Sequence, residues 1–168
     1  MDNNHKVGAI GRPGFDWEYR IVDDKMAPVN PGTPGELIVK GPGVMREYYK
    51  NPEATRETLQ DGWLLTGDVA REDDDGFIWL VDRKKDVIIT GGENIYPVEI
   101  EDFLMGHSKI MDAAVIGLPS LRLGEIAAAI IKPKPDCELT RMEVEDFCTA
   151  LPRYKRPRKI IFGEVPTS

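Results

Sequence analysis

The sequence is poor in the residues that build disulfides and metal centres. It contains only two cysteines and two histidines among 168 residues. Cys137 and Cys148 lie eleven positions apart, which fits neither a paired metal-binding motif nor a disulfide framework. Cys148 lies on a hydrophobic helical stripe and is expected in the core. His5 and His107 are solitary, and neither is assigned a catalytic role, because a catalytic histidine needs an orienting partner.

Long hydrophobic segments are missing as well. The longest uninterrupted apolar run is the six residues 126–131, whereas a membrane-spanning helix needs about 20. The first residues include an acid, and no apolar stretch follows them, so they do not read as a secretory signal. These absences predict a cytoplasmic protein without a transmembrane segment.

An excess of positive charge is the third absence. Lysine and arginine number 22 against 29 aspartates and glutamates, which gives a formal net charge of −7. A surface this acidic argues against broad binding to nucleic acid, so any anion site must be local. Hydrophobic residues make up 41% of the chain, enough to bury a core in one ordinary domain or two small ones.

The first half of the chain has the pattern of a small β-rich unit. Apolar runs framed by turn residues predict strands at residues 35–41 and 77–81, the second of them after an Asp-rich turn at 73–76. A short helix is expected at 51–59, where Pro52 suits the first turn. No helical span is long enough to cover a parallel sheet.

The second half predicts a compact β-α-β-β-α-β domain, which makes the whole chain α+β. Its strands are expected at 87–89, 113–117, 126–131 and 159–162, and its first helix opens at Pro97. Its second helix begins at Thr140, where Thr140 and Glu143 form a capping box. We therefore divide the chain into a β-rich subdomain (1–82), a connecting segment (83–86) and an α+β domain (87–168).

Several ordered stretches carry a more specific signal than composition does. Residues 63–68 read WLLTGD, residues 82–101 read DRKKDVIITGGENIYPVEIE, and residues 41–45 and 48–55 read GPGVM and YYKNPEAT. Together with IGRP at residues 10–13, they closely resemble motifs of the adenylate-forming enzymes. That superfamily includes acyl-CoA synthetases, firefly luciferase and the adenylation domains of peptide synthetases. The resemblance runs over nearly the whole chain.

This resemblance implies a two-step reaction. A carboxylic acid attacks ATP to form an acyl adenylate and pyrophosphate, and the thiol of coenzyme A then displaces AMP to form a thioester. The implied cofactors are ATP, Mg²⁺ and coenzyme A, with the Mg²⁺ ligand outside this sequence. The sequence of residues 82–101 resembles that of acyl-CoA synthetases of fatty and aromatic acids, whereas peptide-synthetase domains usually have Gly-Arg-x-Asp in this motif.

Two residues match the family's nucleotide-binding positions. Asp68 matches the aspartate that binds the ribose, and an ionised carboxylate can accept hydrogen bonds from both hydroxyls of a diol. Arg83 matches the arginine that contacts the nucleotide through a planar, permanently charged fork. On the residues alone, Asp68 is more often a turn residue and the cluster 82–86 would be a solvated loop, in which Lys84 is expected to be only solvated.

Two further positions match the parts of the family that move and meet the thiol. Lys85 falls at the family's hinge between its large and small domains, and in the adenylating arrangement it is expected to continue an extended loop. Gly91 and Gly92 match the loop that approaches the pantetheine arm of coenzyme A, although a plain hairpin turn also explains them. The basic stretch 153–159 is open to two interpretations, a contact with the phosphates of coenzyme A or a solvated face.

The resemblance also implies parts that this sequence does not contain. The family's phosphate loop, Mg²⁺ ligand and acyl pocket are expected before Met1, in the N-terminal domain of the same chain, and its catalytic lysine after Ser168. We therefore expect a C-terminal fragment that is inactive alone, and we assign no catalytic residue in it. Two alternatives stay open: an adenylation domain that loads a carrier protein, and a non-catalytic interaction module that kept the fold.

Overall fold

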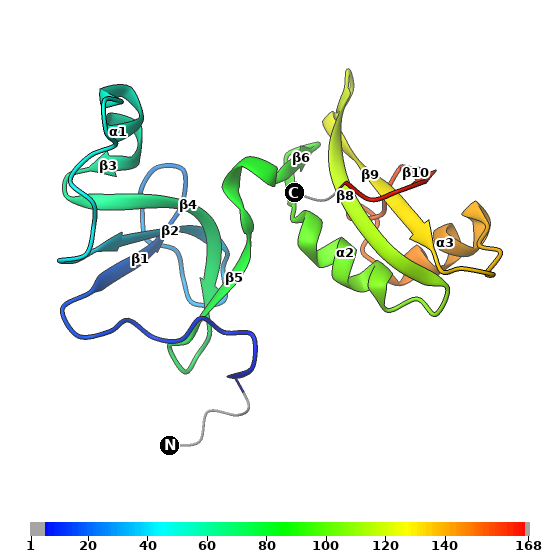
Figure 1. Cartoon of the computed structure of the whole chain (residues 1–168), viewed down its shortest axis with the longest axis horizontal. Coiled ribbons are helices and arrows are strands. Elements are labelled where there is room, and N and C mark those ends of the chain that lie inside the picture. Colours follow the sequence, from blue (N-terminus) through cyan, green and yellow to red (C-terminus); the bar gives the residue numbers. More distant parts are fainter. Residues whose placement is uncertain (1–5, 167–168) are drawn as a thin grey trace. The chain divides into compact units, whose positions relative to one another are not determined.

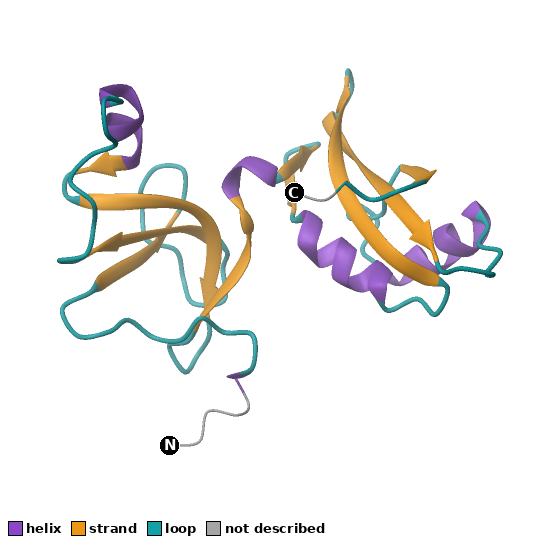
Figure 2. Cartoon of the chain, viewed as in Figure 1, coloured by secondary structure: helices purple, strands orange, loops and turns teal. Residues whose placement is uncertain are grey.

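The computed structural model describes residues 6–166, and the chain folds as two units, Met1–Lys85 and Asp86–Ser168. Each unit contains its own sheet (Figures 1 and 2). The boundary between the units lies inside residues 83–86, the segment expected to act as a hinge. Whether this segment moves stays a prediction.

The first unit is built on one antiparallel sheet of five strands. Its order is β1-β2-β4-β3, with β5 paired to β4. The elements are β1 (Glu18–Val22), β2 (Gly35–Lys40), α1 (Pro52–Thr58), β3 (Leu59–Gln60), β4 (Trp63–Glu72) and β5 (Ile78–Arg83). A 3₁₀ turn, η2 (Lys84–Asp86), follows β5 and crosses the boundary between the units. Ile21, Leu37, Ala70 and Ile78 form its buried core.

Local signals explain two of these elements. The β4–β5 turn forms because the Asp73 carboxylate accepts hydrogen bonds from the amides of Asp75 and Phe77, while Gly76 takes a φ of +78°. Helix α1 begins after Asn51, whose side chain accepts a hydrogen bond from the amide of Ala54. The expected turn at 73–76 and the expected short helix are therefore confirmed.

The strand pattern missed three of the five strands of this sheet. Only β2 and β5 were expected, whereas β1, the two-residue β3 and the ten-residue β4 are strands as well, and β4 pairs with three neighbours. Gly67 and Asp68 interrupt the apolar pattern of β4, and both residue types are rare in strands. The residues on either side of them pair with β2 and β5, and this pairing keeps β4 one strand despite the local preference.

The second unit is a mixed sheet with two helices. Its order is β10-β9-β6-β7, with β8 paired to β9, and only β10 runs parallel to its neighbour. The elements are β6 (Ile88–Thr90), β7 (Glu93–Ile95), α2 (Pro97–Met105), β8 (Ile110–Ser120), β9 (Gly124–Pro133), α3 (Arg141–Phe147), η3 (Cys148–Ala150) and β10 (Lys159–Phe162).

The expected β-α-β-β-α-β order is confirmed with one correction. A short strand, β7, stands between the first strand and the first helix, because a two-residue turn folds residues 93–95 back onto β6. Three residues are too few to show a period in the sequence. The strands at β8 and β9 are also longer than their apolar centres indicated.

Both helices cover the same face of this sheet. Ile100 and Leu104 of α2 and Val144 of α3 are fully buried in one cluster with Ala129 and Ile131 of β9. Because side chains alternate along a strand, residues 129 and 131 point to one face. Cys148 is 3% exposed and joins this core, as expected, whereas Cys137 is exposed.

The capping box of α3 is confirmed and is tied to the sheet. The Thr140 hydroxyl accepts a hydrogen bond from the Glu143 amide at 3.2 Å, and the Glu143 carboxylate accepts one from the Thr140 amide at 2.8 Å. The same carboxylate pairs with the Lys109 ammonium at 2.5 Å. Lys109, together with these bonds from Thr140, lowers the pKa of Glu143 to about 2.

This shift predicts an acid-sensitive second unit. The folded pKa of about 2 lies below the ordinary value of 4.5, so the stabilisation is complete above pH 4.5 and is lost as the pH falls through 2. We expect the urea concentration at the midpoint of unfolding to fall as the pH is lowered over this window. The unfolding is followed by the methyl signals of buried Val144. Glu143→Gln should flatten the dependence, while Glu145→Gln in the same helix should leave it in place. Identical acid profiles for the native chain and Glu143→Gln would contradict this.

Candidate functional site

The structure brings Asp68 and Arg83 together. They lie opposite each other in the register of β4 and β5, and a guanidinium nitrogen of Arg83 is 3.0 Å from a carboxylate oxygen of Asp68. The Asp68 side chain is 27% exposed and that of Arg83 is 60% exposed. A ligand can therefore reach both groups from solvent. Their expected role toward a nucleotide stays a prediction.

A bulge in β4 presents Asp68. The β2–β4 ladder steps from Glu36 opposite Val69 to Ile38 opposite Leu65, so residues 66–68 of β4 stand opposite one residue of β2. The Thr66 hydroxyl donates to the carbonyl of that residue, Leu37, at 2.7 Å and accepts from the Asp68 amide at 3.1 Å. Gly67 takes a φ of +72° within the bulge, a conformation that favours glycine.

Lys84 corrects one expectation from the sequence. It was expected to be only solvated, but its ammonium lies 2.8 Å from the carboxylate of Glu36 and 3.3 Å from that of Asp24. Glu36 is 7% exposed. Its hydrogen bond raises the pKa of Lys84. Sequence analysis missed Glu36, because only the structure shows that it shares one face of β2 with buried Ile38, where an apolar side chain is the rule.

Lys85 lies at the junction of the two units. It is the middle residue of η2 and is exposed to solvent. The structure thus shows a 3₁₀ turn where an extended loop was expected. A short exposed turn of this kind can change its backbone angles without uncovering a core, which is what a hinge requires. The hinge role itself is a prediction.

Gly91 and Gly92 form the two-residue turn between β6 and β7. Their φ angles are +59° and +90°, so both central residues of this hairpin take the left-handed conformation that glycine favours. The Gly91 amide donates to the Leu123 carbonyl at 2.8 Å. No atom lies within 4 Å of where a side chain of Gly92 would begin. The outer side of the turn is therefore open to a ligand.

Part of the basic stretch 153–159 has a structural use. The Lys155 ammonium pairs with the Glu99 carboxylate at 2.6 Å. The Arg156 guanidinium donates to the backbone carbonyls of Leu151 and Thr149 at 2.9 and 2.7 Å. Two of its five cations thus hold the loop before β10 to α2 and to residues 149–151, which neither interpretation of the stretch had included.

The remaining candidates from the sequence have plain structural surroundings. The His107 ring packs edge-on against Phe147, 4.8 Å between ring centres, and His107 accepts a hydrogen bond from the Lys109 amide. His5 and Ser168 lie outside the described residues. Within residues 6–166, no cluster of three His, Cys, Asp or Glu side chains is arranged to hold a metal ion. No helix in this range is long and apolar enough to cross a membrane.

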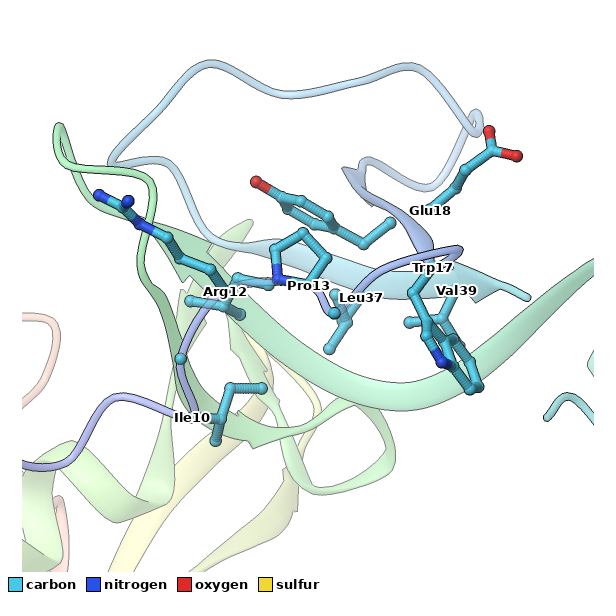
Figure 3. Close-up of a pocket in the computed structure, with 11 residues that line it drawn as sticks. Ile10, Arg12, Pro13, Trp17, Glu18, Leu37 and Val39 are labelled. Atoms are coloured by element: carbon cyan, nitrogen blue, oxygen red, sulfur yellow. The ribbon is translucent and has the colours of Figure 1, made fainter. Parts of the chain in front are cut away.

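A separate apolar pocket of about 320 Å³ lies in the first unit (Figure 3). Its walls include Leu37, Val39 and Trp17, and Arg12 lies at its edge. The Arg12 guanidinium lies 4.5 Å from the centre of the Phe77 ring and also donates to the carbonyl of Asp75. Neither of the expected nucleotide-binding residues lines this pocket, so it is not part of the candidate site.

Comparisons with known families match two parts of the chain. Residues 1–49 match the description "AMP-binding enzyme", and residues 99–167 match "AMP-binding enzyme C-terminal domain". The two matches follow each other in the order of the two units.

Individual proteins match the chain nearly end to end. A feruloyl-CoA synthase from Amycolatopsis sp is 43% identical over all of this chain, which spans 35% of that protein. A long-chain-fatty-acid–CoA ligase from Salmonella typhimurium is 46% identical over 97% of the chain and is covered to 29%. The chain therefore spans about a third of the length of these curated relatives.

A solved structure extends the likeness to three dimensions. The o-succinylbenzoate CoA synthetase of Bacillus subtilis, in complex with its acyl-adenylate intermediate, superposes with a TM-score of 0.87 at 36% identity. The match covers 96% of this chain and 33% of that one.

Proposed function

Because the chain belongs to the AMP-binding, adenylate-forming enzymes, we propose that it is the C-terminal third of an ATP-dependent acyl-CoA synthetase. The observation that carries the proposal is the meeting of Asp68 and Arg83 at an exposed position of β4 and β5. The chemistry of this pair suits a ribose, and relatives in the family include several CoA ligases.

The proposed reaction has two steps. An oxygen of a carboxylic acid attacks the α-phosphorus of ATP, which releases pyrophosphate and forms an acyl adenylate. The sulfur of coenzyme A then attacks the acyl carbon, so that AMP leaves and a thioester forms. The adenylate is needed because a free carboxylate is a poor electrophile, and AMP is a far better leaving group than oxide.

In the first step, Asp68 and Arg83 would position the nucleotide. The Asp68 carboxylate accepts hydrogen bonds from ribose hydroxyls, and its 27% exposure leaves acceptor positions open. Arg83 donates to the ribose or to phosphate oxygens while its charge steadies the neighbouring carboxylate. Their ion pair therefore keeps both side chains aimed at one place before the ligand arrives.

In the second step, the small domain would turn about Lys85 and bring the Gly91–Gly92 turn to the pantetheine arm. The open side of Gly92 supports this, since a backbone without side chains lets a narrow thiol arm pass closely. Mg²⁺ would arrive with ATP and neutralise its phosphates. Its ligands are proposed to lie outside this chain. The proposed location is the cytoplasm, where ATP and coenzyme A are both present.

The relatives do not agree on one acid. They are named for feruloyl-CoA, for 2-succinylbenzoate and for long-chain fatty acids. We therefore propose carboxylic acids of the fatty and aromatic classes as the substrates, without choosing between them.

The test is an assay of the full-length enzyme with a panel of fatty and aromatic acids. We expect acid-dependent release of pyrophosphate from ATP, and thioester formation with coenzyme A but not with a carrier protein. The purified 168 residues serve as the control and should release no pyrophosphate, since positioned charge around the leaving group supplies most of the catalysis.

Two results would contradict the proposal. Thioester formation on a carrier protein alone would identify a carrier-loading adenylation enzyme. Absence of pyrophosphate release with every acid, from a full-length protein that is folded, would identify a non-catalytic interaction module.

A further inference from the structure

Glu36 is a charged residue at a buried strand position, where apolar side chains are usual. It lies on β2, is 7% exposed, and is one of only two polar or charged residues that are buried among the described residues. A buried carboxylate is costly unless it is paired and hydrogen-bonded. Here it is both paired and hydrogen-bonded, and its two partners come from parts of the first unit that are distant from it in the sequence.

The two partners stand next to the expected nucleotide-binding pair. One oxygen of Glu36 accepts a hydrogen bond from the Gly67 amide at 3.3 Å, and the other pairs with the Lys84 ammonium at 2.8 Å. Gly67 immediately precedes Asp68, and Lys84 immediately follows Arg83. The carboxylate therefore reaches the chain neighbour of each member of the pair.

The position of this contact follows from the strand register. The β4–β5 ladder ends at Asp68 opposite Arg83, and Gly67 and Lys84 are the next residues outward. At this point β4 bulges away from β2, and Lys84 enters the 3₁₀ turn. Glu36 thus spans Gly67 and Lys84 where the β4–β5 ladder has ended.

We propose that Glu36 is a positioning residue whose carboxylate ties Gly67 to Lys84. This contact of Glu36 with Gly67 and Lys84, called the tie below, holds Asp68 and Arg83 in register. It also holds Lys84, at the start of the connecting segment, to the β-rich unit, so that any hinge motion begins at Lys85. The tie itself is independent of what the pair binds. Its effect on ATP rests on the proposed function.

The structure supplies a matched control for Lys84. Its ammonium also lies 3.3 Å from the carboxylate of Asp24, which is 92% exposed. Exposed ion pairs contribute little, whereas a buried carboxylate that loses its partner is strongly destabilised. Removing Asp24 should therefore leave the tie intact, while removing Lys84 should release it.

The first experiment measures amide hydrogen exchange in the 168-residue chain by NMR. The Gly67 rate is divided by that of Ile78, whose amide donates to the Gly11 carbonyl at 2.9 Å, so that general destabilisation of the unit cancels. We expect Glu36→Ala and Lys84→Met to raise this ratio by about tenfold, Asp24→Asn to stay within about twofold, and Lys84→Arg to restore the native value. An unchanged ratio in both Glu36→Ala and Lys84→Met would overturn the tie.

The second experiment separates positioning from simple stability. In the full-length enzyme, Lys84→Met should raise the KM for ATP by about fivefold or more and leave the KM for the acid unchanged, with Lys84→Arg close to native. An unchanged KM for ATP despite faster Gly67 exchange would overturn the positioning role. If the native enzyme forms no adenylate, the proposed function fails instead, and the exchange ratio still decides the tie.

Discussion

Lys85→Pro should leave adenylate formation within about tenfold of the native rate while thioester formation falls by about two orders of magnitude or more. The two barriers would then differ by at least about 1.4 kcal/mol. If the small domain turns about Lys85, this residue must adopt two backbone conformations. Proline fixes its own φ near −65° and also disfavours helical angles at the preceding residue, so only one conformation should survive.

The structure indicates which backbone conformation is lost. Lys84 and Lys85 form consecutive residues of the 3₁₀ turn η2, and a proline at 85 would push Lys84 toward an extended conformation. The arrangement with an extended connection should therefore survive, and the family resemblance assigns that connection to adenylate formation. The loss should fall mainly on the thioester step.

Half-reactions of the full-length enzyme test this directly. Pyrophosphate release reports the first step, and transfer from preformed acyl adenylate to coenzyme A reports the second. Lys85→Ala is the control, because it removes the charge and leaves the backbone free. Lys84→Met is the second control, because proline at 85 also disturbs the contact with Glu36. Equal loss of both half-reactions in the Ala and Pro variants would make Lys85 a ligand rather than a pivot.

Asp68→Ala should weaken ATP affinity or the adenylation rate by roughly 10- to 150-fold, with the preference among acids unchanged. Loss of a charge-assisted hydrogen bond costs about 1.5–3 kcal/mol, which corresponds to that range. The structure adds a second reason. Arg83 loses the carboxylate that lies 3.0 Å from its guanidinium, so the guanidinium is no longer held in one orientation.

Variants around the pair separate charge from shape. Asp68→Asn keeps the size and one acceptor but not the charge, and it should fall between the native enzyme and Asp68→Ala. Glu57→Gln in α1 removes an exposed carboxylate of the same unit and should have no effect. Because Asp68 and Arg83 touch, the double variant Asp68→Ala/Arg83→Ala should cost less than the sum of the single ones. Native ATP affinity together with a native adenylation rate in Asp68→Ala would refute the assignment.

Local chemistry was enough to predict much of the second unit and the turns of the first. The capping box at Thr140 and the turn at Asp73 depend on side chains that bond within four residues, so their sequence signals are complete in themselves. The helix that opens at Pro97 follows from apolar periodicity and the strand at 159–162 from a short apolar run, whereas the parallel pairing of β10 with β9 was not predicted.

The site was predicted only in part. Motifs identified Asp68 and Arg83 separately, but nothing in the local pattern showed that they form an ion pair across β4 and β5. Lys84 looked solvated because its partner, Glu36, stands 48 positions earlier in the chain. Glu36 itself was passed over because a single charged residue at the start of a strand is ordinary when its surroundings are unknown.

The sequence by itself determined the family, the acidic composition and the elements whose signals lie within a turn or two of the chain. Only the tertiary structure decided the bulge at residues 66–68, the opposition of Asp68 and Arg83, and the contact of Glu36 with Gly67 and Lys84. These features depend on strand register and burial. Each joins residues 15 to 48 positions apart, and such pairings exist only once the strands have packed side by side.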